Sequence, residues 1–453
     1  MDGVIKLHQR RKIGLLRLDL LVTLNLQPIL REVIDDRMKG FPHGVTPLPL
    51  QDFSAQEWNV VRGDMPFPIA IIKTSALSHN AQWMRDFTAE TGVLLAPHGK
   101  TTMCPQIFER QIGAGAWGMT VATVQQLGIC VALGIRRIIM ANQLVSRLDV
   151  ARVVELCNRH ADLEFYFLID SVQQLQLVAA HAQRYTLERP LTALLELGLA
   201  GGRTGARTAD EALAVARAVA STPSVVLAGV ECYEGLTITG DAEEDARHVG
   251  GFLEYVKDVA AACDAQGLFT RDTIILSAGG SAVFDIVARE LPTRLSRPVQ
   301  TILRSGCYVT HDSGLYERMF RAVEKRGGDR SRIKPGLRPA LEVWTQVQSR
   351  PEPTLAILTM GKRDVSYDVD MPRPIAWYRA SIHDRPQAVS PEWRITKLND
   401  QHAYLDLPAD ADLMVGDLLG CGISHPCTTF DKWQLLIEVD DAYNVIGGLR
   451  TFF

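Results

Sequence analysis

The most constraining feature of this sequence is an eightfold alternation of short apolar runs with amphipathic stretches between residues 92 and 306. The runs are rich in β-branched residues, whereas the stretches between them carry apolar residues at helical spacing. Strands that are apolar on both faces and alternate with helices indicate a buried parallel sheet. Eight such units are typical of a closed (β/α)8 barrel, with a doubly wound open sheet as the alternative. The runs occupy residues 92–97, 118–123, 136–142, 163–170, 191–198, 225–233, 272–280 and 299–306.

The sequence on either side of these runs predicts two further parts. Residues 1–66 form an extension with a leucine-rich possible helix and a proline-rich stretch, and residues 67–310 form the barrel. Residues 66–87 resemble a strand and a helix that precede the first barrel strand, and they could pack with the C-terminal part. After residue 311 prolines are frequent and short alternating segments follow. Residues 311–453 are therefore predicted to form a mostly antiparallel β domain.

Composition excludes several classes of function. The chain has 48 Lys and Arg against 52 Asp and Glu, which argues against a nucleic-acid or membrane-surface binder. No apolar run approaches the roughly 18 residues that span a bilayer. The eight cysteines form no CxxC pair, which fits a reducing compartment. We expect a soluble, cytoplasmic protein with a small-molecule partner.

One motif is misleading. Gly113, Gly115 and Gly118 match the G-x-G-x-x-G fingerprint of dinucleotide-binding sites. A helical segment precedes these glycines and a strand follows them, which is the reverse of the order that a pyrophosphate site needs. We interpret the motif as a tight turn.

A lysine and two glycine-rich loops follow predicted barrel strands. Lys100 lies after the first run, at the barrel face that carries active sites. A lysine in such a turn can be partly desolvated and act as a nucleophile or a base, although an isolated one is usually a solvated loop residue. Glycines after the seventh and eighth runs let backbone N–H groups approach an anion, at the usual phosphate site of barrels. A lysine opposite a phosphate cup indicates a phosphorylated aldehyde, for which pyridoxal phosphate is the obvious candidate. The loop residues are Gly279, Gly280 and Ser281, and then Gly306, Cys307 and Tyr308.

A third group of polar residues lies near the C-terminus. His425 and Cys427 are separated by one residue, and imidazole nitrogen with thiolate suits Zn²⁺ with open positions for water or substrate. Two ligands alone are a weak signal, since an ordinary turn with one buried cysteine has the same pattern.

Six motifs follow one another along the chain: PHGKTTMCPQIF around Lys100, Arg203-Thr-Gly205, Tyr233-Glu-Gly235, SAGGS, SGCYVTHD and the terminal HPC. Taken in order, these motifs resemble the D-serine dehydratase/D-threonine aldolase family, and most closely its bacterial amino acid deaminase branch. The resemblance covers roughly residues 66–450. It implies the alanine-racemase-like fold (fold type III of the pyridoxal phosphate enzymes), which is a barrel with a β domain. It also implies a homodimer with active sites near the subunit interface.

The resemblance also implies roles for individual residues. Lys100 would be the Schiff-base lysine and the base that removes the α-proton. Gly279, Gly280 and Ser281 with Gly306 and Cys307 would hold the phosphate. Tyr233 and Tyr308 would lie against or near the cofactor ring, Arg203 would lie on its far side, and His425 and Cys427 would hold the metal.

Two positions depart from the family pattern. Thr102 stands where the family often has a histidine, which puts any role of that histidine in doubt. Glu196 stands where an aspartate is commoner, which is a milder change.

The implied activity is dehydration of a D-3-hydroxy amino acid, with D-serine as the default substrate. In this family a His-x-Cys pair resembles the zinc dehydratases, and His-x-Asp resembles the Mn²⁺-type aldolases. Cys427 therefore favours dehydration over cleavage of D-threonine-type substrates to glycine and an aldehyde. Racemization would need a second base that no residue identifies, and a vestigial carrier protein would need no metal pair.

Overall fold

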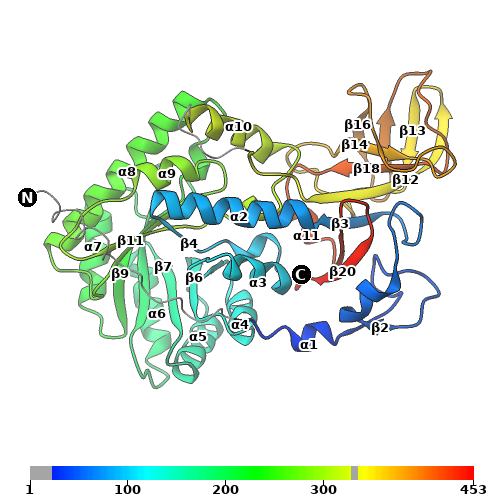
Figure 1. The fold of residues 1–453 in the computed structure, drawn as a ribbon. Coiled ribbons are helices and arrows are strands. Elements are labelled where there is room, and N and C mark those ends of the chain that lie inside the picture. Colours follow the sequence, from blue (N-terminus) through cyan, green and yellow to red (C-terminus); the bar gives the residue numbers. More distant parts are fainter. Residues whose placement is uncertain (1–22, 328–334) are drawn as a thin grey trace, which may run out of the picture.

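Residues 23–327 and 335–453 are described by a computed structural model, in which eight parallel strands form a barrel (Figure 1). Neighbouring strands follow the order β4-β11-β10-β9-β8-β7-β6-β5. A parallel bridge between His98 and Thr120 joins the two ends of this order, so the sheet closes. All eight predicted runs contain one strand each, and the closed barrel is confirmed. The strands are β4 (Leu94–Leu95), β5 (Met119–Val121), β6 (Arg137–Gln143), β7 (Glu164–Ile169), β8 (Leu191–Leu197), β9 (Val225–Cys232), β10 (Ile274–Ala278) and β11 (Val299–Leu303).

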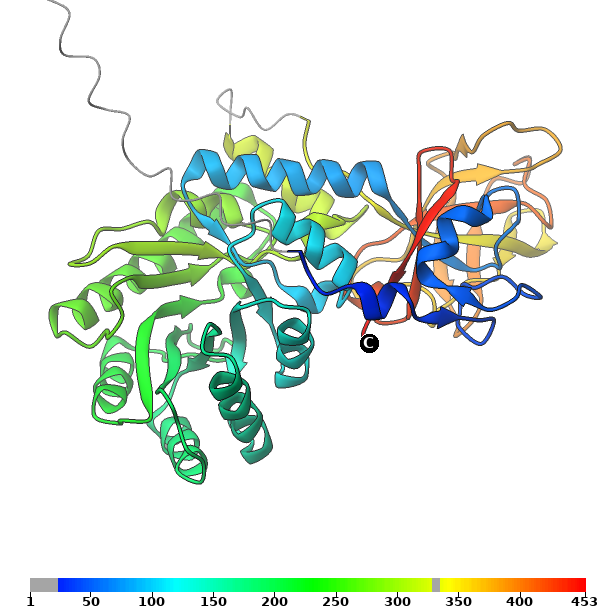
Figure 2. The same cartoon turned by 60° about the horizontal axis from the view of Figure 1, so that its bottom comes forward.

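Both faces of the barrel strands are buried, which explains why the runs are continuously apolar. The inner face carries a small cluster that includes Ile139, Leu194 and Ile302, and alternate residues point outward into a larger core under the helices. Figure 2 shows these helices around the outside of the barrel. They are α2 (Thr74–Thr91), α3 (Pro105–Gly113), α4 (Val124–Ala132), α5 (Arg147–Arg159), α6 (Val172–Ala182), α7 (Ala209–Ala220), α8 (Ala242–Ala265), α9 (Phe284–Glu290) and α10 (Leu315–Gly327).

The C-terminal part forms a mostly antiparallel sheet, as predicted. Its longest path of paired strands is β15-β14-β18-β12-β13-β17-β16, and β19 pairs with β20 beside it. The strands are β12 (Leu341–Glu352), β13 (Leu355–Leu358), β14 (Arg373–Tyr378), β15 (Gln387–Ala388), β16 (Arg394–Leu398), β17 (Ala403–Asp406), β18 (Leu418–Gly422), β19 (Leu435–Val439) and β20 (Val445–Arg450).

Strand β3 (Ile69–Lys73) belongs to this C-terminal sheet, although it lies inside the predicted barrel range of 67–310. It pairs antiparallel with β12 and parallel with β19, so its isoleucines are buried between two C-terminal strands. Helix α2 then carries the chain from this sheet to the barrel (Figure 1). The two parts are therefore connected twice, and the exact domain limits stay a prediction.

The N-terminal segment packs on the C-terminal sheet beside β20 (Figure 2). Its elements are α1 (Gln27–Leu30), β1 (Val33–Ile34), β2 (Leu48–Pro49) and the 3-10 helix η1 (Leu50–Gln56). Phe53 is fully buried here, and a side chain at Gly448 of β20 would collide with Leu50. Most of the predicted leucine-rich helix lies in residues 1–22, outside the described residues.

The glycine motif at residues 113–118 is a turn between α3 and β5, as interpreted. A side chain at Gly118 would collide with the carbonyl oxygen of Arg137 on the neighbouring strand, so this glycine permits close strand packing. None of the described helices is long and apolar enough to cross a membrane.

Candidate active site

A cavity of about 430 Å³ opens at the carboxyl ends of the barrel strands and extends to the C-terminal domain. A larger hollow of about 770 Å³ lies at the edge of the β domain, but no lysine, histidine or cysteine lines it. Ten of the eleven predicted site residues line the 430 Å³ cavity. They are Lys100, Arg203, Tyr233, Gly279, Gly280, Ser281, Gly306, Cys307, His425 and Cys427.

Lys100 enters the cavity from the short 3-10 helix η2 (Gly99–Thr101), directly after β4. Gly99 permits this turn because a side chain there would come within 3.0 Å of the ring of Phe108. The neighbouring His98 has its pKa held well below the usual value by burial first and by the charge of Lys100 second. A neutral imidazole therefore lies beside the lysine, and its Nδ1 atom has no hydrogen-bond partner.

The two glycine loops form a cradle that side chains would fill. A Cβ atom at Gly306 would lie 2.5 Å from the carbonyl oxygen of His98, and Gly279 has φ of 99°, which favours glycine. The N–H groups of Gly279 and Gly280 donate to the carboxylate of Glu234, at 3.0 and 2.5 Å. Two of the predicted phosphate-binding residues therefore already donate their backbone N–H groups to a carboxylate.

These observations test whether pyridoxal phosphate fits the site. The cavity offers one primary amine, a glycine cradle and two buried polar atoms without partners, His98 Nδ1 and Glu231 Oε2. A phosphorylated aromatic aldehyde requires an amine for its carbonyl group, N–H donors for its phosphate and polar partners for its ring. The residues present fit the cofactor.

Sequence reasoning missed the buried ion pair that lines the cavity. Arg304 at the end of β11 pairs with Glu231 of β9 and donates to Ser277 Oγ at 2.9 Å. Burial raises the pKa of Glu231 to about 8, while the charge of Arg304 opposes this shift. The sequence did carry a signal for this pair, which is a charged residue near the end of an otherwise apolar strand. A charged side chain at such a buried position needs a partner of opposite charge.

Arg203 lies over the ring of Tyr233, with its guanidinium carbon 4.9 Å from the ring centre. The loop that carries Arg203 is fixed by Glu196, which accepts a hydrogen bond from Thr204 Oγ1 at 2.6 Å. Burial raises the pKa of Glu196. Glu196, which stands where the family more often has an aspartate, therefore holds this loop in place through a hydrogen bond.

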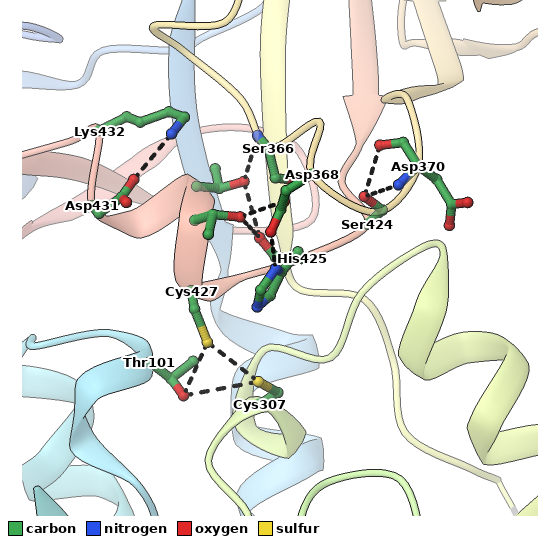
Figure 3. A network of polar contacts seen from close by, with 12 residues as sticks. Thr101, Cys307, Ser366, Asp368, Asp370, Ser424, His425, Cys427, Asp431 and Lys432 are labelled. Atoms are coloured by element: carbon green, nitrogen blue, oxygen red, sulfur yellow. Dashed lines mark hydrogen bonds and ion pairs between the residues drawn. The ribbon is translucent and has the colours of Figure 1, made fainter. Parts of the chain in front are cut away.

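His425 and Cys427 lie where the C-terminal domain meets the barrel (Figure 3). The Nδ1 atom of His425 lies 2.6 Å from Asp368 Oδ2, and Thr428 donates to the other oxygen of Asp368 at 2.8 Å. A hydrogen bond with Cys427, and after it one with Asp368, raises the pKa of His425 to about 9. Hydrogen bonds with Cys307 and His425 hold the pKa of Cys427 well below its usual value. Asp368 is a third residue that sequence reasoning missed, after Arg304 and Glu231.

This arrangement suits a metal ion with open positions. A carboxylate on one ring nitrogen of a histidine orients the other nitrogen as a ligand, and Cys427 offers a thiolate beside it. Within residues 23–327 and 335–453, no three His, Cys, Asp or Glu side chains are grouped so that they could hold a metal ion. A metal held by His425 and Cys427 would have open positions for water or substrate.

Tyr308 is the predicted residue that does not line the cavity. Its side chain is 2% exposed, and its hydroxyl accepts a hydrogen bond from Gln111 at 3.3 Å within the core. Tyr316 lines the cavity instead, beside Cys307. The buried carboxylate of Asp312 accepts the backbone N–H of Tyr316 at 3.0 Å and so fixes the first turn of α10.

Thr102, which stands in place of a family histidine, is 2% exposed and does not line the cavity. Its hydroxyl accepts the backbone N–H of Cys104 at 3.4 Å, so it stabilises the turn before α3.

Two domain models match the chain. The model described as "Alanine racemase, N-terminal domain" matches residues 72–298, and "Putative serine dehydratase domain" matches residues 340–439. The 3-hydroxy-D-aspartate aldolase of Paracoccus denitrificans (strain Pd 1222) is 25% identical over 374 residues, which are 81% of this chain and 87% of that protein.

Solved structures show the same fold. The D-threonine aldolase from Filomicrobium marinum has a TM-score of 0.69 at 23% identity, over 86% of this chain and 95% of that one. The D-threo-3-hydroxyaspartate dehydratase from Delftia sp. HT23 has a TM-score of 0.64 at 21% identity, over 85% of this chain and 97% of that one. The two models together match well over half of the sequence, and the relatives that match most of the chain are D-amino acid aldolases. The chain therefore belongs to the fold type III pyridoxal phosphate lyases of the D-serine dehydratase and D-threonine aldolase family.

Proposed function

We propose that this protein is a pyridoxal phosphate- and metal-dependent dehydratase of D-3-hydroxy amino acids, with D-serine converted to pyruvate and ammonia. The observation that carries the proposal is that Lys100 and the His425–Cys427 pair line one cavity from opposite domains. Such a cavity lets a base act at Cα while a metal acts on the oxygen at Cβ of the same small substrate.

When bound, pyridoxal phosphate supplies an electron-accepting ring that stabilises negative charge at Cα. Lys100 is the base in this proposal, and its amine takes the α-proton of the D-amino acid. The His98 imidazole beside Lys100 is neutral, so it adds no second positive charge next to that amine. Arg203 and Tyr233 limit the cavity on another side and orient what binds there.

His425 and Cys427 would hold a divalent metal, for which Zn²⁺ is the proposal and Mn²⁺ the alternative. A metal there supplies Lewis-acid chemistry, which eases the departure of a hydroxyl group that is otherwise a poor leaving group. Asp368 holds the imidazole of His425 in one orientation. The neutral phenol of Tyr316 lies on the same side of the cavity, where it can donate a hydrogen bond to the substrate.

The second candidate is a D-threonine-type aldolase, which gives glycine and an aldehyde. Relatives that match more than four fifths of the chain support it, since they are named 3-hydroxy-D-aspartate aldolase and D-threonine aldolase. The dehydratase relative matches 33% of the chain in sequence but shares the fold over 85%. One solved structure of that dehydratase is of a cysteine-to-alanine mutant in the metal-free form.

We also propose a homodimer in the cytoplasm. The family resemblance supports both proposals, and sedimentation of the purified chain measures the first.

D-Threonine separates the two activities, because one substrate yields different products. We expect 2-oxobutyrate and ammonia, lost when a chelator removes the metal and restored by Zn²⁺. If glycine and acetaldehyde form instead, the protein is an aldolase and the dehydratase proposal is wrong. If 2-oxobutyrate still forms after complete removal of the metal, the proposed role of the His425–Cys427 pair is wrong. The rates of oxo acid formation from D-serine, D-threonine and D-3-hydroxyaspartate in the same assay give the order of substrate preference.

A further inference from the structure

Two cysteines from different domains meet at the edge of the cavity. Cys307 begins the short 3-10 helix η4 (Cys307–Val309) after β11, and Cys427 begins α11 (Cys427–Phe430) of the C-terminal domain. Their sulfur atoms lie 3.6 Å apart, although 120 residues separate them in the sequence. Figure 3 shows both sulfurs facing each other beside Thr101, whose Oγ1 lies 3.8 Å from Cys307 Sγ and 3.5 Å from Cys427 Sγ.

This pair differs from the other cysteines in its access to small molecules. Both Cys307 and Cys427 line the 430 Å³ cavity, and Cys427 is the half-buried one of the eight cysteines. The other six are buried and none of them lines this cavity. A small oxidant that enters the cavity therefore reaches these two sulfurs first.

We propose that Cys307 and Cys427 form an oxidative modification site, in which a peroxide converts the two thiols to a disulfide between the barrel and the C-terminal domain. The sulfur of Cys427 first attacks one oxygen of hydrogen peroxide, so that an S–O bond forms and the O–O bond breaks; the displaced hydroxide takes the proton of Cys427 and leaves as the first water, and Cys427 becomes a sulfenic acid. The sulfur of Cys307 then attacks it, so that an S–S bond forms and the S–O bond breaks. The leaving oxygen takes the proton of Cys307 and departs as water. One peroxide is reduced to two waters, and two thiols are oxidised.

The distance that the sulfurs must travel is short. A disulfide needs about 2 Å between its sulfur atoms, so the present 3.6 Å has to close by about 1.6 Å. The product takes Cys427 away from its partner His425 and moves Cys307 within the cradle beside Gly306. It therefore disables both the proposed metal ligand and the proposed phosphate site, and a dithiol reductant reverses it.

Peptide mapping tests this site without any measurement of activity. The full-length protein with bound cofactor, with and without a chelator, is treated with hydrogen peroxide, alkylated to block free thiols and digested. We expect a cross-linked peptide that joins residues 307 and 427, the loss of two of the eight free thiols, and recovery of both with dithiothreitol.

Two variants serve as controls. Cys157→Ala removes a cysteine of similar exposure, 8% against 5% for Cys307, that lies on α5 away from the cavity. The variant should form the cross-link between residues 307 and 427 to the same extent as the unmodified chain. Cys307→Ser should abolish the cross-link and let Cys427 oxidise further to sulfinic acid. Eight free thiols after peroxide treatment, a cross-link between other cysteines, or sulfinic acid at Cys427 in the unmodified chain would overturn the proposal.

Discussion

Asp368 offers the sharpest test of the metal site, because it contacts the proposed ligand without being one. Its Oδ2 atom lies 2.6 Å from His425 Nδ1, and its side chain is 43% exposed. Replacement by asparagine keeps the shape and removes the negative charge. Loss of such a carboxylate typically weakens metal affinity about 10- to 100-fold. At about 1.4 kcal/mol for each tenfold change, the expected loss is roughly 1.4–2.8 kcal/mol of binding free energy.

The assay is competition for Zn²⁺ between the protein and a chromogenic chelator, with the cofactor absorbance as a check that the barrel site is intact. Asp370→Asn is the matched control, since this nearby carboxylate pairs with Arg318 at 2.8 Å and does not contact His425. We expect Asp370→Asn to retain the affinity of the unmodified chain and Asp368→Asn to lose at least tenfold. Equal affinities for both variants would refute the view that Asp368 orients a metal-binding imidazole.

Three further predictions concern the rest of the site. Lys100→Ala should abolish the visible absorbance that pyridoxal phosphate gains when it is bound through the lysine amine. Titration with pyridoxal phosphate measures this absorbance, and its retention would show that Lys100 does not bind the cofactor covalently. Gly306→Ala should destabilise the fold by about 1–3 kcal/mol, because its Cβ would lie 2.5 Å from the carbonyl oxygen of His98. Urea denaturation measures this loss, and an unchanged midpoint would contradict the view that a side chain does not fit at this position. His311 is 3% exposed, and burial lowers its pKa to about 4, below the roughly 6.5 of an unfolded chain. The unfolded state therefore binds more protons between pH 6.5 and 4, so this group makes stability fall by up to roughly 3 kcal/mol as pH drops through that window. His311→Asn, which tolerates the positive φ of 47°, should flatten the slope of stability against pH there, and an unchanged slope would show that other groups control acid unfolding.

The barrel could be predicted from the sequence because its signal is local. Each strand is buried on both faces, so its apolar run appears in consecutive residues such as those of β8 (Leu191–Leu197). The position of Lys100 followed from the same pattern, since it comes directly after the first run at the face where barrel sites lie.

The missing site residues carry no such local signal. Asp368 lies 57 residues before His425 in an exposed stretch, and only the fold brings the two side chains together. Tyr316 lines the cavity because the buried Asp312 turns the chain back after η4, whereas the nearer Tyr308 points into the core. The sequence places Tyr308 inside the SGCYVTHD motif, but only the fold shows that Tyr316 is the tyrosine of this region that lines the cavity.

The location of the site also determines what can disrupt it. Lys100 and Cys307 come from the barrel, whereas His425 and Cys427 come from the C-terminal domain, and Thr101 of the barrel contacts the sulfur atoms of both cysteines. The distance between base and metal pair therefore depends on how the domains pack, and this packing is fixed where β3 joins the C-terminal sheet and α2 returns to the barrel. A change at this junction that leaves both domains folded would move the two halves of the site apart. Such a change should lower turnover while each half still binds its own ligand, because catalysis requires both halves at one substrate whereas binding does not.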